Sequence, residues 1–112
     1  MNVADYIIAF LGSLGVRHIF GYPGSPLVPL LAALERQDVV SWVLMRHENA
    51  AAMAAGAHAR LTGELGVCAA TSGPGALNAI CGVIDADLDR VPVLPSPAKF
   101  LRLRSGTGTS RM

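Results

Sequence analysis

Apolar residues recur at helical spacing in the first segment of the chain. Over residues 3–14 they return every three or four positions, which predicts an amphipathic helix. Asn2 is suited to cap this helix, Asp5 lies in its first turn, and Gly15 follows its last turn. The same spacing predicts further helices at residues 26–34, 49–63 and 76–86, and Ser25 suits the N-cap of the first of these.

Short apolar runs alternate with these helices and predict strands at residues 16–20, 39–44, 65–70 and 91–94. Strand and helix follow each other at a spacing that suits right-handed crossovers. The sequence therefore predicts an α/β fold, with a parallel sheet covered by helices on both faces. The largely apolar run at residues 39–44 suits a strand that is buried on both sides.

The composition narrows the class of protein. With 112 residues the chain forms at most one domain. Hydrophobic residues make up 52% and charged residues 15%, without an apolar run long enough to span a membrane, so we expect a surface that something else covers. The net charge of +1 argues against a nucleic-acid partner, and the N-terminus lacks a signal peptide, so we expect a cytoplasmic protein.

Several chemically reactive or bulky side chains are interpreted as structural. The three histidines are not spaced as a metal cluster, so no metal ligand is expected in this chain. The two cysteines are expected to be small core residues in a reducing compartment. The residues assigned to the core on these grounds are Trp42, Met53, Cys68 and Cys81.

Glu48 stands between a predicted strand and a predicted helix. It follows the run at residues 39–44 and lies in the first turn of the alanine-rich helix. Ligands of open α/β sheets bind at the carboxyl ends of the strands, so this position suits a functional carboxylate. Acidic residues are also common in first turns because the helix macrodipole favours them. Position alone leaves both interpretations open.

Three predicted loops leave the same edge of the sheet, because parallel strands all end there: residues 21–26, 45–47 and 71–75. The last contains Gly-Pro-Gly, which lets a flat ligand approach the backbone next to the unpaired N–H groups of a helix N-terminus. Gly-Pro-Gly also occurs in ordinary tight turns. It is not a P-loop, since no Lys-Ser or Lys-Thr follows it.

Five spaced motifs occur in order: Phe20-Gly21-Tyr22-Pro23-Gly24; Arg46-His47-Glu48; Thr62-Gly63; Thr71-Ser72-Gly73-Pro74-Gly75 with Asn78; and Asp85-Ala86 with Val91-Pro92-Val93. Together they resemble the pyrimidine-binding (PYR) domain of thiamine-diphosphate enzymes, in the group of pyruvate oxidase, quinone-dependent pyruvate dehydrogenase and acetolactate synthase. The match covers residues 1–94. It implies a partial PYR domain, that is, an incomplete thiamine-diphosphate-binding fold.

The resemblance implies a catalytic role for Glu48. Its counterpart hydrogen-bonds a ring nitrogen of the cofactor's aminopyrimidine and promotes the imino tautomer, which takes the proton from the thiazolium carbon. Other residues match positions that line or shape the cofactor pocket. The cofactor-binding residues implied in this way are Pro23, Gly24, Glu48, Thr71, Pro74 and Asn78.

Details of residues 54–57 and 63–65 look closer to the pyruvate oxidase and quinone-dependent pyruvate dehydrogenase branch than to acetolactate synthase. The resemblance thus implies a parent that decarboxylates a 2-oxo acid with thiamine diphosphate, with Mg²⁺ and FAD bound mainly outside this chain. The alternatives are an acetolactate synthase-like fragment and a PYR-only subunit that pairs with a separate diphosphate-binding subunit.

The resemblance also implies how the parent is assembled. The cofactor would lie between the PYR domain of one subunit and the diphosphate-binding domain of another, within a homo-oligomer. Contact with a membrane surface is conceivable only for the full-length parent. We expect the isolated chain to be inactive.

The resemblance ends at Leu94, and residues 95–112 have no apolar periodicity. They are interpreted as a disordered basic tail, a linker, or the product of a shifted reading frame. In the frame formed by the last base of each codon and the first two of the next, permitted codons encode Ala-Ile-Ala-Gly-Gln-Val-Pro, then Glu-Ile-Gly and Tyr-Phe-Gln. Since this pattern resembles the family's continuation, we favour a frameshifted tail.

Overall fold

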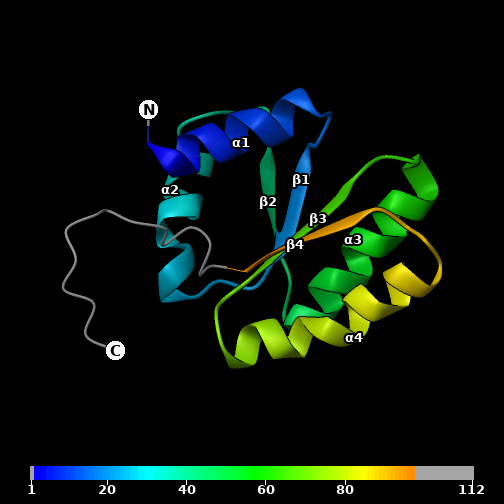
Figure 1. Ribbon diagram of the computed structural model, residues 1–112. Helices are drawn as coiled ribbons and strands as arrows, with labels where there is room; N and C mark the ends of the chain where they lie inside the picture. The colour runs from blue at the N-terminus through cyan, green and yellow to red at the C-terminus, as the bar shows by residue number, and fades with distance from the viewer. Residues whose placement is uncertain (1, 98–112) are drawn as a thin grey trace.

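A four-stranded parallel sheet forms the centre of the protein (Figure 1). The computed structural model describes residues 2–97, and within them the strand order is β2-β1-β3-β4. Ile19 of β1 is in register with Trp42 of β2 on one side and with Val67 of β3 on the other. The strands are β1 His18–Gly21, β2 Ser41–Leu44, β3 Gly66–Ala70 and β4 Val93–Pro97. The predicted α/β class is confirmed.

Helices cover both faces of the sheet, as the alternation along β3 shows. Val67 and Ala69 belong to one buried cluster with residues of α1 and α2, whereas Cys68 and Ala70 belong to another with residues of α3. Successive side chains of a strand point to opposite faces, so the two clusters lie on opposite sides of the sheet. The helices are α1 Val3–Ser13, α2 Val28–Glu35, α3 Glu48–Thr62 and α4 Pro74–Leu88, with a short 3₁₀ turn, η1 Ser25–Leu27, before α2.

The start of α1 is fixed by reciprocal side-chain hydrogen bonds between Asn2 and Asp5, which confirms the predicted cap by Asn2. Asn2 Oδ1 accepts from the Asp5 backbone N–H at 2.9 Å, and Asp5 Oδ2 accepts from the Asn2 N–H at 3.1 Å. This capping box satisfies donors that the first helical turn leaves without partners.

None of the helices within residues 2–97 has the length and apolar character needed to cross a membrane.

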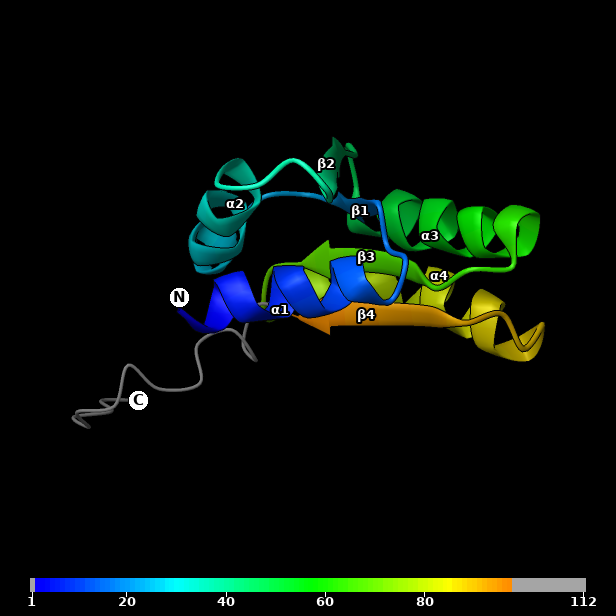
Figure 2. The same cartoon turned by 90° about the horizontal axis from the view of Figure 1, so that it is seen from above.

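Small residues allow α3 to approach its neighbours closely. A Cβ atom on Gly66 of β3 would collide with the backbone carbonyl of Ala55, and one on Gly82 of α4 would lie 2.5 Å from Ala52 Cβ. Figures 1 and 2 show α3 and α4 side by side along their lengths. The alanine-rich sequence of α3 and the two glycines therefore set the distance between α3, α4 and the sheet.

The strand β2 is shorter and more exposed than the sequence suggests. Its expected first residues, Val39 and Val40, are held in a turn by Gln37, whose Oε1 accepts from both backbone N–H groups at 2.9 and 2.8 Å. Within residues 2–97, β2 pairs only with β1 and is an edge strand. Its residues are exposed or half-buried. The expectation of burial on both faces was wrong because a hydrophobic run does not reveal how many neighbours its strand will have.

Several other expectations need correction. Ser25 is the first residue of η1 and Gly24 occupies the N-cap, while α4 begins at Pro74 instead of residue 76. Met53 is 42% exposed and Cys81 is exposed, so only Trp42 and Cys68 of the assigned core residues pack into the interior. Since α3 and α4 each turn one side away from the sheet, an apolar residue on either helix need not be buried.

The strand β4 extends beyond Leu94, because Pro95 and Ser96 are in register with Cys68 and Ala69 of β3. The division of the chain at Leu94 stays a prediction. Residues 98–112, which make up most of the proposed frameshifted tail, lie outside the described residues.

Candidate functional site

The ends of β1, β2 and β3 meet at one edge of the sheet, because all three strands are parallel and adjacent. The loop after β2 leads directly into α3, and Glu48 is the first residue of that helix. The loop after β3 leads into α4, which begins at Pro74. The sequence-based expectation that these loops share an edge is confirmed.

Glu48 is buried in the first turn of α3. It is 8% exposed, and it is the only buried charged residue within residues 2–97. Burying a carboxylate is unfavourable unless hydrogen bonds or opposite charge compensate. Asn78 on α4 supplies one such contact, because its Nδ2 donates to Glu48 Oε2 at 3.2 Å. The macrodipole at the start of α3 supplies a second favourable interaction.

His47 caps α3 in the position before Glu48. Its backbone is extended, and its Nδ1 accepts a hydrogen bond from the Asn49 N–H at 3.0 Å. Its Nε2 lies 3.9 Å from Glu48 Oε2. This contact could not be predicted from the sequence, because Ser, Thr, Asp and Asn are the usual N-cap residues and histidine gives no comparable signal.

Glycines and Thr71 form the surface next to Glu48. A Cβ atom on Gly75 would lie 2.5 Å from Thr71 Cγ2 and 3.3 Å from Glu48 Oε1. A Cβ atom on Gly24 would lie 2.7 Å from Thr71 Cβ. Five residues from two loops and two helices are thus successive neighbours: Gly24, Thr71, Gly75, Glu48 and Asn78. Gly75 is a further residue at the site, which the sequence indicated only through the Gly-Pro-Gly pattern.

The loop before α4 depends on a glycine with a positive φ. Gly73 has φ +74° and ψ −125°, a conformation that is strained for other residues, and no side chain caps the helix there. Pro74 then occupies the first turn, where its missing N–H leaves no hydrogen bond unmade. The backbone of α4 therefore begins beside Glu48 with N–H groups that no side-chain cap covers.

Two of the sequence-predicted residues, Pro23 and Pro74, have exposed side chains. Pro23 is exposed and lines a cavity of about 610 Å³ with Leu34 and Trp42. The side chain of Pro74 is exposed at the start of α4. The contacts of Glu48 with Asn78, His47 and Gly75 do not involve either proline, and a place for Pro23 and Pro74 in the cofactor pocket stays a prediction.

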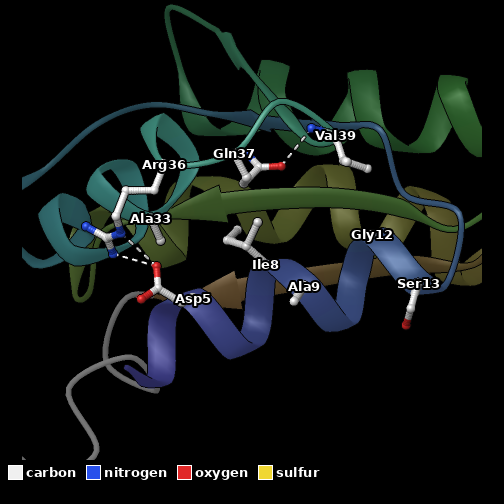
Figure 3. A pocket seen from close by; sticks show the side chains of 9 residues that line it. All are labelled: Asp5, Ile8, Ala9, Gly12, Ser13, Ala33, Arg36, Gln37 and Val39. Carbon is white, nitrogen blue, oxygen red and sulfur yellow. Dashed lines mark hydrogen bonds and ion pairs between the residues drawn. The ribbon is translucent and has the colours of Figure 1, made fainter. Parts of the chain in front are cut away.

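A separate cavity of about 570 Å³ lies between α1, α2 and the turn at Gln37 (Figure 3). Ile8 and Ala33 line its apolar part. Asp5 and Arg36 form an ion pair at one end of it, at 2.6 Å, which also joins α1 to the end of α2. No residue of the Glu48 group lines this cavity, so it is not part of the same site.

The buried carboxylate of Glu48 lies in a first helical turn at the carboxyl edge of a parallel sheet, which is where proteins with open α/β sheets bind their ligands. Residues 1–95 match the family described as "Thiamine pyrophosphate enzyme, N-terminal TPP binding domain", and the chain belongs to this family. The predicted resemblance to thiamine-diphosphate enzymes is confirmed.

Curated relatives carry the name of acetolactate synthase. The chain is 50% identical over 94 residues to the isozyme 2 large subunit of Escherichia coli, covering 84% of this chain and 17% of that protein. It is 47% identical over 96 residues to the large subunit of Pyropia yezoensis, covering 83% of this chain and 16% of that protein. For the probable large subunit of Methanocaldococcus jannaschii the identity is 49% over 94 residues, with 84% and 16% covered.

These relatives favour the alternative branch over the preferred one. The sequence placed the parent nearer to pyruvate oxidase on the basis of residues 54–57 in α3 and residues 63–65 between α3 and β3, whereas these relatives are named acetolactate synthases. The chain spans about one-sixth of their length, at 16–17%. What the whole protein does is therefore a matter for proposal.

Proposed function

We propose that this chain binds the aminopyrimidine part of thiamine diphosphate and that Glu48 is the carboxylate that shares a proton with a ring nitrogen of the cofactor. The parent would be an acetolactate synthase-like enzyme that acts on 2-oxo acids. The observation that carries the proposal is the burial of Glu48 beside Asn78 and Gly75, at the carboxyl edge of a sheet in this family.

The residues around Glu48 fit a flat, nitrogen-containing ring. Glu48 Oε2 has a donor in Asn78, while Oε1 is near the position that a side chain on residue 75 would fill. An alanine there would place its Cβ 3.3 Å from Oε1 and would also collide with Thr71. Only glycine fits at position 75, so the backbone of α4 packs directly beside Oε1 and Thr71.

When bound, the cofactor supplies the carbon nucleophile that attacks the carbonyl of a 2-oxo acid. The chain's own contribution is to hold a proton at Glu48 next to the ring and to keep that carboxylate in place through Asn78. Because Glu48 is only 8% exposed, the electrostatic contacts of its carboxylate are stronger than they would be in open water. Gly24 and Thr71 would form the adjoining surface of the pocket, and Pro23 and Pro74 would shape the loops that enclose it.

The rest of the site would lie on another domain. We propose that the diphosphate of the cofactor and Mg²⁺ are held by a diphosphate-binding domain of a second subunit, and that any FAD is bound outside this chain. The apolar residues that α4 exposes support a protein partner: Leu77, Ile80, Ile84 and Leu88. An apolar hollow of about 610 Å³ between α4 and the strands β3 and β4 adds to this surface. The same surface would suit a PYR-only subunit that pairs with a separate diphosphate-binding subunit.

A chimeric enzyme tests the role of Glu48. Residues 1–94 of this chain would replace the matched segment of the Escherichia coli isozyme 2 large subunit, and acetolactate formation would be measured with and without thiamine diphosphate. We expect cofactor-dependent activity that falls by roughly 10²–10⁴-fold in Glu48→Gln, as is typical when an acid–base group is lost. The exposed Glu35, at the end of α2, provides the control, because Glu35→Gln should leave the rate unchanged.

An active chimera in which Glu48→Gln keeps its full rate would refute the assignment. The isolated chain is expected to form no acetolactate. If it does so after purification, the proposed need for a second domain is wrong. The shifted reading frame of residues 95–112 has its own check in the coding sequence of the locus: if the alternative frame does not continue as an open frame, that interpretation fails.

A further inference from the structure

The two carboxylate oxygens of Glu48 have different surroundings. Asn78 Nδ2 lies 3.2 Å from Oε2, and His47 Nε2 lies 3.9 Å from the same oxygen. Within residues 2–97 no hydrogen bond is made to Oε1, which lies close to Gly75, 3.3 Å from the position that a Cβ atom on that residue would take. One oxygen is therefore held by the protein, and the other is left for a ligand.

The hydrogen bond to Asn49 determines which nitrogen of His47 carries the proton. Because Nδ1 accepts from the Asn49 N–H at 3.0 Å, it has no proton of its own. In the neutral imidazole the proton must then be on Nε2, which is the nitrogen near Glu48. A distance of 3.9 Å is too long for a direct hydrogen bond, but the positive end of the N–H dipole still attracts the carboxylate.

We propose that His47 is a positioning residue for Glu48. Through Nδ1 it fixes the first turn of α3, and through Nε2–H it draws Oε2 away from Gly75, so that Oε1 is presented to the ligand. Asn78 on α4 donates a hydrogen bond to the same oxygen and helps to fix its position. An ordinary N-cap residue such as serine or asparagine would provide the first of these contacts without the second.

Two substitutions separate the contacts. Asparagine is among the best N-cap residues, so His47→Asn retains an acceptor for the Asn49 N–H while it removes the donor near Glu48. His47→Ala removes both. Arg46→Ala is the control, because Arg46 is exposed in the same loop and contributes to neither contact. All variants would be made in the full chain of 112 residues.

Nuclear magnetic resonance supplies both readouts without any cofactor. Exchange of the Asn49 amide proton reports on the cap, and the χ1 coupling constants of Glu48 report whether its side chain keeps one rotamer. In the natural chain we expect a protected Asn49 amide and a single Glu48 rotamer. Loss of an N-cap weakens a first turn by roughly fivefold in equilibrium constant, so exchange of Asn49 should be faster by about that factor in His47→Ala. In His47→Asn the exchange rate should stay within about twofold, while the Glu48 rotamers become averaged.

A single Glu48 rotamer in His47→Asn would overturn the proposal, because His47 would then act as a cap alone. Unchanged protection of the Asn49 amide in His47→Ala would also overturn the proposal, because His47 would then not cap α3. The meaning of this positioning rests on the proposed function of Glu48, but the two tests are independent. An inactive chimera would count against the proposed function and leave the rotamer measurement unaffected, whereas averaged rotamers in the natural chain would count against His47 only.

Discussion

Replacing Gly82 by alanine should destabilise the protein and disturb the site at the same time. Gly82 lies where α4 crosses α3, and an added Cβ would lie 2.5 Å from Ala52 Cβ, 3.0 Å from the Met53 nitrogen and 3.1 Å from the Asn49 carbonyl oxygen. These atoms belong to, or are fixed by, the backbone of α3, so no side-chain rotation relieves the contact. The two helices must instead move apart by roughly 1 Å to restore ordinary van der Waals separation.

The size of the effect follows from two opposing terms. Overpacking in a well-packed interior typically costs about 1–3 kcal/mol, whereas removing a glycine from the middle of a helix gains about 0.5–1 kcal/mol. The net loss should be about 1–2 kcal/mol. For a domain of this size that corresponds to a fall in melting temperature of roughly 5–15 °C.

Gly56 provides a matched control on α3. It is also a buried helical glycine, but its added Cβ would meet only the flexible end of Arg60 at 3.4 Å and Ala86 Cβ at 3.8 Å. Gly56→Ala should therefore melt at the same temperature as the natural chain or a few degrees higher. Thermal unfolding followed by circular dichroism, at concentrations where the chain does not associate, compares the two. Equal melting temperatures for the two variants would refute the inferred close approach of α3 and α4.

Three further predictions concern other parts of the fold. Gln37→Ala should lower the free energy of unfolding in urea by about 1–3 kcal/mol, since Gln37 donates to two carbonyls and accepts from two N–H groups. Gln37→Glu at neutral pH should lose at least as much, because a carboxylate oxygen would face the Leu34 and Val40 carbonyls that Nε2 now contacts. The hydrogen bonds from Arg36 lower the pKa of Asp5 below its ordinary value of 3.8. The stability that this ion pair contributes is therefore present above that pH and is lost as the pH falls below it. In Asp5→Asn the acid limb of the stability–pH curve should be shallower, and an unchanged limb would contradict the assignment. Burial raises the pKa of the Cys68 thiol to about 11. A thiol reagent at about pH 8 should therefore label the exposed Cys81 in the native chain and label Cys68 only after denaturation. Labelling of both cysteines in the native state would show that the strand β3 opens.

The position of Glu48 could be predicted from the sequence because it depends on local patterns. An apolar run, a break and an alanine-rich helical segment place the residue at the end of a strand and the start of a helix whatever the remaining chain does. Alternation of strands and helices then makes the sheet parallel, and a parallel sheet collects its loops at one edge. The order of the motifs was sufficient to indicate the family. The branch within the family was not predictable in this way, because the few residues used for it lie in α3 and in the connection from α3 to β3, outside the group of residues around Glu48.

Burial of Glu48 and the identity of its neighbours were decided by the tertiary structure. Asn78 lies thirty positions further along the chain and reaches Glu48 only because Ala52 and Gly82 let α3 and α4 approach closely. The imidazole cap at His47 likewise has no sequence signature, since it depends on the side-chain geometry at one helix start. Sequence periodicity shows which side of an element is apolar, but the distance between two elements depends on the side chains that meet there. For this protein the local sequence pattern determined that Glu48 lies between a strand and a helix. The packing of α3 against α4 determined which side chains Glu48 contacts.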